Sequence, residues 1–358
     1  MRSRVWGGTA AVVLGGLLAA GCGGGEKKNA ADGRTGKSAA GAYPVSVTDC
    51  RGARTTFSDA PKGIVTSNAS SLELLLRLGA GDKVIGTGFP PGKGTLPGGL
   101  DAQGQKVKVL SRNVIPKEKL LGSGADVYVD TFASMGGMSG GGGMGDVPTE
   151  EEFTAAGIKH LYLKSTACAA QGKKPVRDLS AVEADITSLG AVTGTSAKAK
   201  ELVAGMKEKV GAVQKAVGGT AAGKRPTYFF FDYDAGTKQP TVVCNRQVAN
   251  AVITLAGARN AFADCEGDNK QVGWEDVIAK NPDWIQLGVR DRGSEAANKK
   301  AFDEAQKWLE TNPATKGLKA VEEGHFLRIG SEPTTIAGVQ NAETVEKIAR
   351  TLYPGKVG

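Results

Sequence analysis

The chain has 358 residues, with 45 lysines and arginines against 37 aspartates and glutamates, and its formal net charge is +8. Six basic and two acidic residues fall within residues 1–42, so half of the excess charge lies in that short segment. The remainder carries both signs interspersed and no basic stripe with interleaved aromatic residues, which argues against nucleic-acid binding.

Residues 1–22 have the pattern of an export signal. Arg2 and Arg4 precede an apolar run that is too short and too glycine-rich to be a spanning helix. The run ends in LAAGC, which resembles the lipobox of bacterial lipoproteins and implies a lipid on Cys22 and attachment to the extracytoplasmic face of the cell membrane. Leu18 lies four residues before the cysteine, where three is usual, so a cleaved signal and a freely secreted protein is the alternative.

Residues 23–42 show no apolar periodicity, and we expect a flexible tether that reaches roughly 25 Å. From residue 43 onward, apolar runs with the strand pattern alternate with segments of helical periodicity. This alternation predicts parallel sheets with covered faces, over a length that suits two domains. In chain order, strands are predicted at 63–67, 126–132 and 158–163, and again at 225–234, 283–289 and 325–330, with helices between them.

Two pairs of segments repeat in the same order in the two halves. EKLLGSGADVYV (118–129) matches EDVIAKNPDWIQ (275–286), and LELLLRLGAGDKVIG (72–86) matches NAVITLAGARNAFAD (250–264). Between the halves, residues from Ser196 onward predict one helix of about twenty residues, roughly 30 Å long. We therefore predict an N-terminal α/β lobe (43–194), a connecting helix (195–218) and a C-terminal α/β lobe (219–358). The alternative is an ordinary surface helix within a single domain.

Five cysteines are present, and four remain if Cys22 carries a lipid: Cys50, Cys168, Cys244 and Cys265. An even number in an exported chain favours disulfides, and four cysteines allow three pairings. A metal cluster is disfavoured, since there is no CxxC motif and the sequence contains only two histidines, His160 and His325.

Five segments together resemble the successive signatures of the iron–siderophore and vitamin B12 class of ABC-transporter solute-binding proteins, and the resemblance covers residues 43–354. The segments are IVTSNASSLELLLRLGAGDKVIGTG, EKLLGSGADVYV, ANAVITLAGARNAFAD, GWEDVIAKNPDWIQL and LKAVEEGHFLRI. The resemblance implies two Rossmann-like lobes joined by a single long helix, with a ligand cleft between the lobes. It also implies no enzymatic activity and no cofactor. The expected ligand is a ferric siderophore or a related chelate such as a corrinoid, which is handed to the permease subunits of an ABC importer.

A cleft between α/β lobes lies outside the carboxyl ends of the strands, so the residues that follow the strands are the candidates for ligand binding. Arginine side chains there suit an anionic chelate. The glycine-rich run FASMGGMSGGGGMG (132–145) suits an adaptable wall, because methionine conforms to bulky, partly apolar ligands. The candidates are Phe89, Phe132, Met135, Met138 and Met144 in the first half and Tyr233, Arg246, Trp274, Arg290 and Arg328 in the second.

Other interpretations of the glycine–methionine run stay open. Its three methionines could hold copper, or the run could be slack without a role. Residues 137–141 fit the G-x-S-x-G nucleophile elbow, so an exported hydrolase using Ser139 with His160 or His325 is the alternative from another class, although the glycines that follow do not favour the helix this motif needs. A lipoprotein sensor that kept the fold without transport is a further alternative.

A disulfide between the lobes would hamper their motion about the connecting helix, so we predict Cys50–Cys168 and Cys244–Cys265, one within each lobe. Glu118 and Glu275 occupy matching positions of the repeat, and the resemblance implies that each reaches arginines on one permease subunit. Helix capping, in which the helix dipole stabilises a carboxylate at the first turn, is the alternative role of these glutamates.

Overall fold

Two four-stranded parallel sheets form the framework of the computed structural model, which describes residues 43–49, 52–132, 147–166, 168 and 172–357. The first sheet has the order β4-β3-β5-β6, and the second has the order β9-β7-β11-β12. All neighbouring strands run parallel, as the alternating pattern predicts. The first sheet contains β3 (Ile64–Thr66), β4 (Val84–Thr87), β5 (Val127–Asp130) and β6 (Lys159–Tyr162). The second contains β7 (Thr227–Asp232), β9 (Arg259–Asn260), β11 (Trp284–Gly288) and β12 (Phe326–Leu327).

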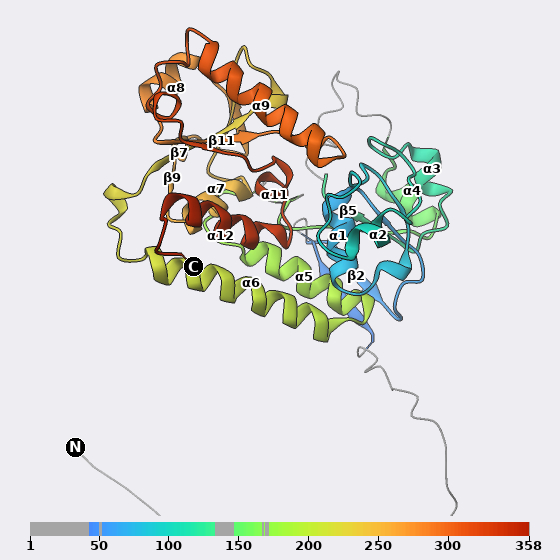
Figure 1. Cartoon of the computed structure of the whole chain (residues 1–358). Coiled ribbons are helices and arrows are strands. Elements are labelled where there is room, and N and C mark those ends of the chain that lie inside the picture. Colours follow the sequence, from blue (N-terminus) through green and yellow to red (C-terminus); the bar gives the residue numbers. More distant parts are fainter. Residues whose placement is uncertain (1–42, 50–51, 133–146, 167, 169–171, 358) are drawn as a thin grey trace, which may run out of the picture. The chain divides into compact units, whose positions relative to one another are not determined.

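Helices connect the strands in both sheets (Figure 1). Those around the first sheet are α1 (Ala69–Arg77), α2 (Leu100–Gly104), α3 (Lys117–Leu121) and α4 (Glu150–Ala155). Two helices lie between the sheets in sequence, α5 (Ser180–Thr193) and α6 (Ser196–Val217). Those of the second half are α7 (Val248–Leu255), α8 (Trp274–Lys280), α9 (Glu295–Thr311), α10 (Lys319–Glu322), α11 (Glu332–Thr335) and α12 (Gln340–Leu352).

Side-chain hydrogen bonds cap the first turn of several of these helices. The Asn68 side chain accepts a hydrogen bond from the backbone N–H of Ser71 at the start of α1. Thr149 and Glu152 form a reciprocal capping box at the start of α4. Such caps satisfy backbone N–H groups that have no partner within the helix.

Two separate two-stranded antiparallel sheets are also present and were not predicted. The pairs are β1 (Val45–Thr48) with β2 (Arg54–Phe57), and β8 (Thr241–Val243) with β10 (Asn269–Gln271).

The repeat in the sequence is a repeat in the structure. The order β3-α1-β4-α3-β5-α4-β6 in the first half matches β7-α7-β9-α8-β11-α9-β12 in the second. Asp126 lies just before β5, and its carboxylate accepts the backbone N–H groups of Lys62 (2.6 Å) and Gly63 (2.9 Å) beside the neighbouring strand β3. Asp283 lies just before β11, and its carboxylate accepts the N–H and the hydroxyl of Thr227 on β7, each at 2.8 Å. The matching aspartates therefore tie the same two strands together in each sheet.

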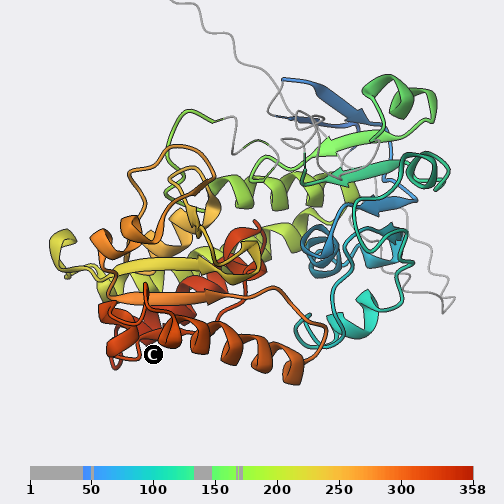
Figure 2. The ribbon, with the colours of Figure 1, turned by 90° about the horizontal axis from the view of Figure 1, so that it is seen from above.

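Helix α6 begins at Ser196, as predicted, and has 22 residues. It packs against α5 along one side and against α12 and α7 further along (Figures 1 and 2). Its buried residues Met206, Val213 and Val217 belong to one hydrophobic core that also contains Ile64 of the first sheet and Tyr228 of the second. The two sheets therefore share a core along this helix.

The described residues belong to one compact unit, Ala40–Gly358. In this part of the chain, helices with the length and apolar character needed to cross a membrane are absent. The boundaries at 194, 195, 218 and 219 stay predictions.

Candidate functional site

An aromatic pair stands at the carboxyl end of the first sheet. Phe89 follows β4, Phe132 follows β5, and their ring centroids are 5.7 Å apart. The structure therefore brings together two residues that were predicted separately to line the ligand cleft. Phe89 has a φ of +32°, which is rare and strained for a residue with a bulky side chain. Its carbonyl accepts the N–H of Ala69 (3.0 Å), which helps to hold this conformation.

Buried polar side chains support the same edge of the sheet. Ser67 and Asn68 follow β3, and Thr131 follows β5. The hydroxyls of Ser67 and Thr131 are 2.9 Å apart, and the Asn68 amide donates to the Thr131 hydroxyl at 2.8 Å. These groups satisfy one another, so the network fixes the backbone on both sides of the aromatic pair.

In the second sheet, the segment after β11 is held by side chains from neighbouring elements. Four consecutive backbone amides, from residue 290 to 293, each donate to a side-chain oxygen. The pairs are Arg290 N to Asp234 (2.7 Å), Asp291 N to Glu332 (3.0 Å), Arg292 N to Asn298 (2.6 Å) and Gly293 N to Asp291 (3.1 Å). Successive free amides would form an anion-binding nest, but these amides are already occupied.

The predicted arginines are also near carboxylates of this chain. Burial raises the pKa of Asp232 and of Glu332, and the positive charge of Arg290 opposes both shifts. Two of the three predicted arginines form ion pairs, Arg246 with Glu266 (3.0 Å) and Arg328 with Asp303 (2.6 Å). Arg292, which was not a candidate, pairs with Asp234. The positive charges of Arg246 and Arg328 are therefore offset within the protein.

The two predicted aromatic residues of the second half occupy different surroundings. Tyr233 follows β7, is half-buried, and packs on Phe231 with ring centroids 6.0 Å apart. Trp274 is the first residue of α8, is 9% exposed, and lies in the core of the second sheet against Phe231 and Trp308. Its indole N–H donates to the Thr237 carbonyl (2.8 Å), so the ring is fixed in place.

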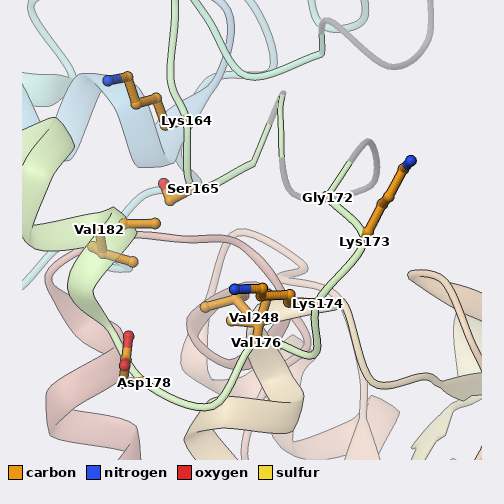
Figure 3. A pocket seen from close by; sticks show the side chains of 10 residues that line it. Lys164, Ser165, Gly172, Lys173, Lys174, Val176, Asp178, Val182 and Val248 are labelled. Atoms are coloured by element: carbon orange, nitrogen blue, oxygen red, sulfur yellow. The ribbon is translucent and has the colours of Figure 1, made fainter. Parts of the chain in front are cut away.

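A cavity of about 390 Å³ lies where the carboxyl end of β6 meets the first residue of α7 (Figure 3). Its sides include Ser165, Val182 of α5 and Val248 of α7, while the Lys173 side chain points away from it. Of the ten predicted ligand-binding residues, the seven that the structure describes do not line this cavity. The sequence signal for this cavity is the predicted strand at 158–163, since residues that follow the carboxyl end of a strand are candidates for ligand binding.

The buried carboxyl of Asp185 holds Lys164 and Ser165, two residues that line this cavity. It accepts the backbone N–H groups of Lys164 (2.9 Å) and Ser165 (2.8 Å) and the Ser165 hydroxyl (2.5 Å). Burial raises the pKa of this carboxyl to about 6, although these hydrogen bonds act to lower it. Asp185 thus links α5 to the end of β6.

The two histidines have structural partners in separate parts of the fold. His160 on β6 lies between Asp130 (3.0 Å) and Glu150 (3.1 Å), and its side chain is 5% exposed. His325 stacks on Trp284 with ring centroids 4.3 Å apart, next to the amino end of β12. Ser139, the proposed nucleophile, and Met135, Met138 and Met144 lie outside the described residues. Among the residues that are described, no group of three or more His, Cys, Asp or Glu side chains is arranged to hold a metal ion.

A family model described as a periplasmic binding protein matches residues 64–333. The chain belongs to the periplasmic binding protein family. It is 25% identical over 362 residues to YvrC of Bacillus subtilis strain 168, an uncharacterised ABC transporter substrate-binding lipoprotein, and the match covers 99% of this chain and 98% of that protein.

Solved structures agree with this assignment. A periplasmic binding protein from Veillonella parvula matches with a TM-score of 0.71 and 25% identity, covering 87% of this chain and 98% of the other. A structure from the Fe³⁺-hydroxamate transport system of Saccharomonospora viridis matches with a TM-score of 0.69 and 21% identity, covering 87% and 100%. The predicted two-lobed fold and its class are thereby confirmed.

This periplasmic binding protein is the substrate-binding component of an ABC transporter and not an enzyme, so the hydrolase alternative built on Ser139 is set aside. Glu118 and Glu275, the two residues predicted to contact the permease, lie at equivalent positions in the structure. Glu118 is the second residue of α3 and Glu275 is the second residue of α8, the helix that matches α3 in the repeat. Both are exposed, and within the described part of the chain neither forms an ion pair.

One of the two predicted disulfides is confirmed. Cys244 and Cys265 are bonded, with Cα atoms 5.0 Å apart, and the bridge lies within the second half of the binding protein. Cys168 is disulfide-bonded too. Cys50, its predicted partner, lies outside the described residues, as does Cys22.

Proposed function

We propose that this protein captures a ferric siderophore of low net charge, such as a ferric trihydroxamate, and delivers it to the permease of its ABC importer. Two observations support the proposal: the Phe89–Phe132 pair at the carboxyl end of the first sheet, and the carboxylates that offset the charges of Arg246 and Arg328. An apolar aromatic surface suits the organic shell of such a chelate. A highly anionic chelate would need arginines that are free to pair with it, since desolvating an unpaired charge is costly. The relationship to a hydroxamate transport structure is one of fold and agrees with this ligand class.

Ligand titration tests the proposal. We expect quenching of tryptophan fluorescence at sub-micromolar concentration by a ferric trihydroxamate, and much weaker effects from a ferric tricatecholate or from cobalamin. Tight binding of cobalamin alone would instead assign a corrinoid, and tight binding of the tricatecholate alone would contradict the argument from charge. If none of the three chelates binds, the ligand class is wrong.

Replacing one ring of the aromatic pair should weaken binding. Phe132→Ala removes an aromatic contact worth about 1 kcal/mol or more, so we expect the dissociation constant of the bound chelate to rise several-fold to tenfold. The matched control is Phe302→Ala on α9, because Phe302 is also a partly buried phenylalanine but packs against the core of the second sheet. An equal loss of affinity in both variants would remove the aromatic pair from the ligand site.

Delivery to the permease is proposed to use Glu118 and Glu275. Two exposed carboxylates at equivalent positions suit a partner with pseudo-twofold symmetry, since each half of the protein then meets one subunit alike. Charges at an interface rim steer and orient a partner more than they add affinity. We expect Glu118→Arg with Glu275→Arg to abolish chelate uptake by cells while ligand affinity is unchanged.

The matched control is Glu208→Arg with Glu304→Arg, which makes the same change of charge at two exposed glutamates on α6 and α9. This control should transport normally. If cells with the Glu118→Arg and Glu275→Arg double variant take up the chelate normally, the two glutamates act only as helix caps.

Anchoring through a lipid on Cys22 is the remaining part of the proposal. A single acyl-type anchor is weak, whereas a multiply acylated cysteine holds a protein at the membrane stably. We expect Cys22→Ser to move the protein from the membrane fraction to the soluble extracytoplasmic fraction. Retention of this variant in the membrane fraction would contradict lipidation.

A further inference from the structure

Gly92 touches the second half of the protein at a point where no side chain would fit. A Cβ atom at this position would lie 2.1 Å from the Asp291 carboxylate and 2.6 Å from the Cα atom of Gly293. Ordinary contact between carbon atoms requires about 3.5–4.0 Å, so the two backbones would have to separate by at least about 1 Å. The segment after β4 and the segment after β11 thus meet in direct contact.

The segment around Gly92 is held by its own half of the molecule. The Gly92 carbonyl accepts hydrogen bonds from the Thr95 hydroxyl (2.8 Å) and the Gln105 amide (3.4 Å). The Gly94 N–H donates to Asp101 on α2 (2.8 Å), and Leu96 is 5% exposed within the hydrophobic core. The segment cannot retreat without breaking these interactions.

The opposing segment is also fixed. The Asp291 carboxylate accepts the Asn298 amide (2.8 Å) and the Gly293 N–H (3.1 Å), and the Asp291 N–H is bonded to Glu332. The atom that a Gly92 side chain would meet on Gly293 is backbone, which cannot rotate aside as a side chain can. Two braced surfaces that meet without room for one carbon atom act as a mechanical stop.

We infer that Gly92 against Asp291 and Gly293 is a stop that limits how closely the two lobes approach each other. Any side chain at Gly92 should hold the lobes further apart. If the chelate proposed above binds between the lobes, the stop also sets the width available to it, and this second step rests on the proposed function.

The test measures the separation of the lobes directly, without ligand. Nitroxide labels are placed through bio-orthogonal amino acids at Lys119 on α3 and Ala279 on α8, both of which are exposed. The mean label-to-label distance is then determined by pulsed electron paramagnetic resonance. We expect the distance to increase in Gly92→Ala and further in Gly92→Leu.

The matched control is Gly99→Leu, because Gly99 is in the same segment, has a φ of −69°, and has open space where its Cβ would lie. It should keep the parent distance. If Gly92→Leu does not fold, Gly92→Ala still decides the question, since one added carbon already exceeds the available space. The inference of a stop is wrong if the Gly92 variants keep the label-to-label distance of the parent protein, or if Gly99→Leu increases that distance equally.

Chelate binding by the same variants separates the two proposals. A longer label-to-label distance in the Gly92 variants, together with several-fold weaker chelate binding, supports both the stop and the proposed ligand. A longer distance in a protein that binds no chelate in any form upholds the stop and refutes the ligand proposal.

Discussion

Burial and charge at single residues decide how the site works. Phe132 could be predicted because it ends the predicted strand at 126–132, and strand ends converge at one edge of a parallel sheet. Phe89 was predicted as well, although its strand, β4, is not among the predicted strands. The ion pairs of Arg246, Arg292 and Arg328 could not be predicted, since their partners come from other segments of the chain. Trp274 gave no signal of its burial either, because its environment depends on Phe231 and Trp308, which are distant in sequence.

The carboxyl of Asp185 should make stability depend on pH. Its pKa is raised by burial from 3.8 to about 6 in the folded protein, so the folded state holds a proton that the unfolded state has already lost. The contribution to stability is therefore fully present below about pH 4 and is lost as the pH rises through about 6. The gap between the two pKa values corresponds to about 3 kcal/mol.

We expect the free energy of unfolding of Asp185→Asn to be flatter between about pH 4 and 6 than that of the parent protein, as measured by urea denaturation. Other buried carboxyls, including Asp232 and Glu332, titrate in both proteins, so the difference isolates Asp185. The control Asp82→Asn, at an exposed position, should keep the parent slope. Parallel curves for Asp185→Asn and the parent would contradict the raised pKa.

Among the elements, the repeat was visible in the sequence because it preserves both polar and apolar positions. The aspartates of the repeat, Asp126 and Asp283, have the same task in each sheet, and this explains why both copies keep them. The short strands β8 and β10 were missed, because β10 consists of Asn269, Lys270 and Gln271, all exposed, without the alternation that marks a half-buried strand. Their pairing is set by tertiary contact instead of local pattern.

Removing either aspartate should destabilise the protein to a similar degree. Asp126→Ala leaves the N–H groups of Lys62 and Gly63 without this acceptor, and Asp283→Ala does the same to Thr227. We expect each variant to lose roughly 1–3 kcal/mol of unfolding free energy. Asp82→Ala should change it by less than about 0.5 kcal/mol, as is usual for exposed sites. A large loss in only one of the two aspartate variants would show that their roles are not equivalent.

At the scale of the whole molecule, the connecting helix is part of the core as well as a link. Its buried face joins residues of both sheets in one hydrophobic cluster, together with Ile186 of α5 and Ile348 of α12. The sequence predicts the helix from its periodicity, but the shared core depends on which helices pack along it. Lobes that share a core should bend only slightly relative to each other and should unfold together.

Calorimetry should therefore show a single unfolding transition, with equal van 't Hoff and calorimetric enthalpies. Met206→Ala, at a residue that is 2% exposed in the middle of α6, should lower stability by about 2–5 kcal/mol and shift this transition without splitting it. Glu208→Ala, two residues further on the exposed side, should leave it nearly unchanged. Two separate transitions in the parent protein would contradict the shared core.

The four occupied amides after β11 have a consequence for hydrogen exchange. Amides of surface segments normally exchange with deuterium quickly, because local opening costs little. Residues 290–293 lie outside helices and strands, yet each of their N–H groups is bound to a side-chain oxygen. The amide protons of residues 290–293 should thus exchange far more slowly than those of the exposed segment 97–99. Glu332→Ala should speed the exchange of the Asp291 amide proton and leave the other three amides of the segment protected, because each amide has its own side-chain acceptor.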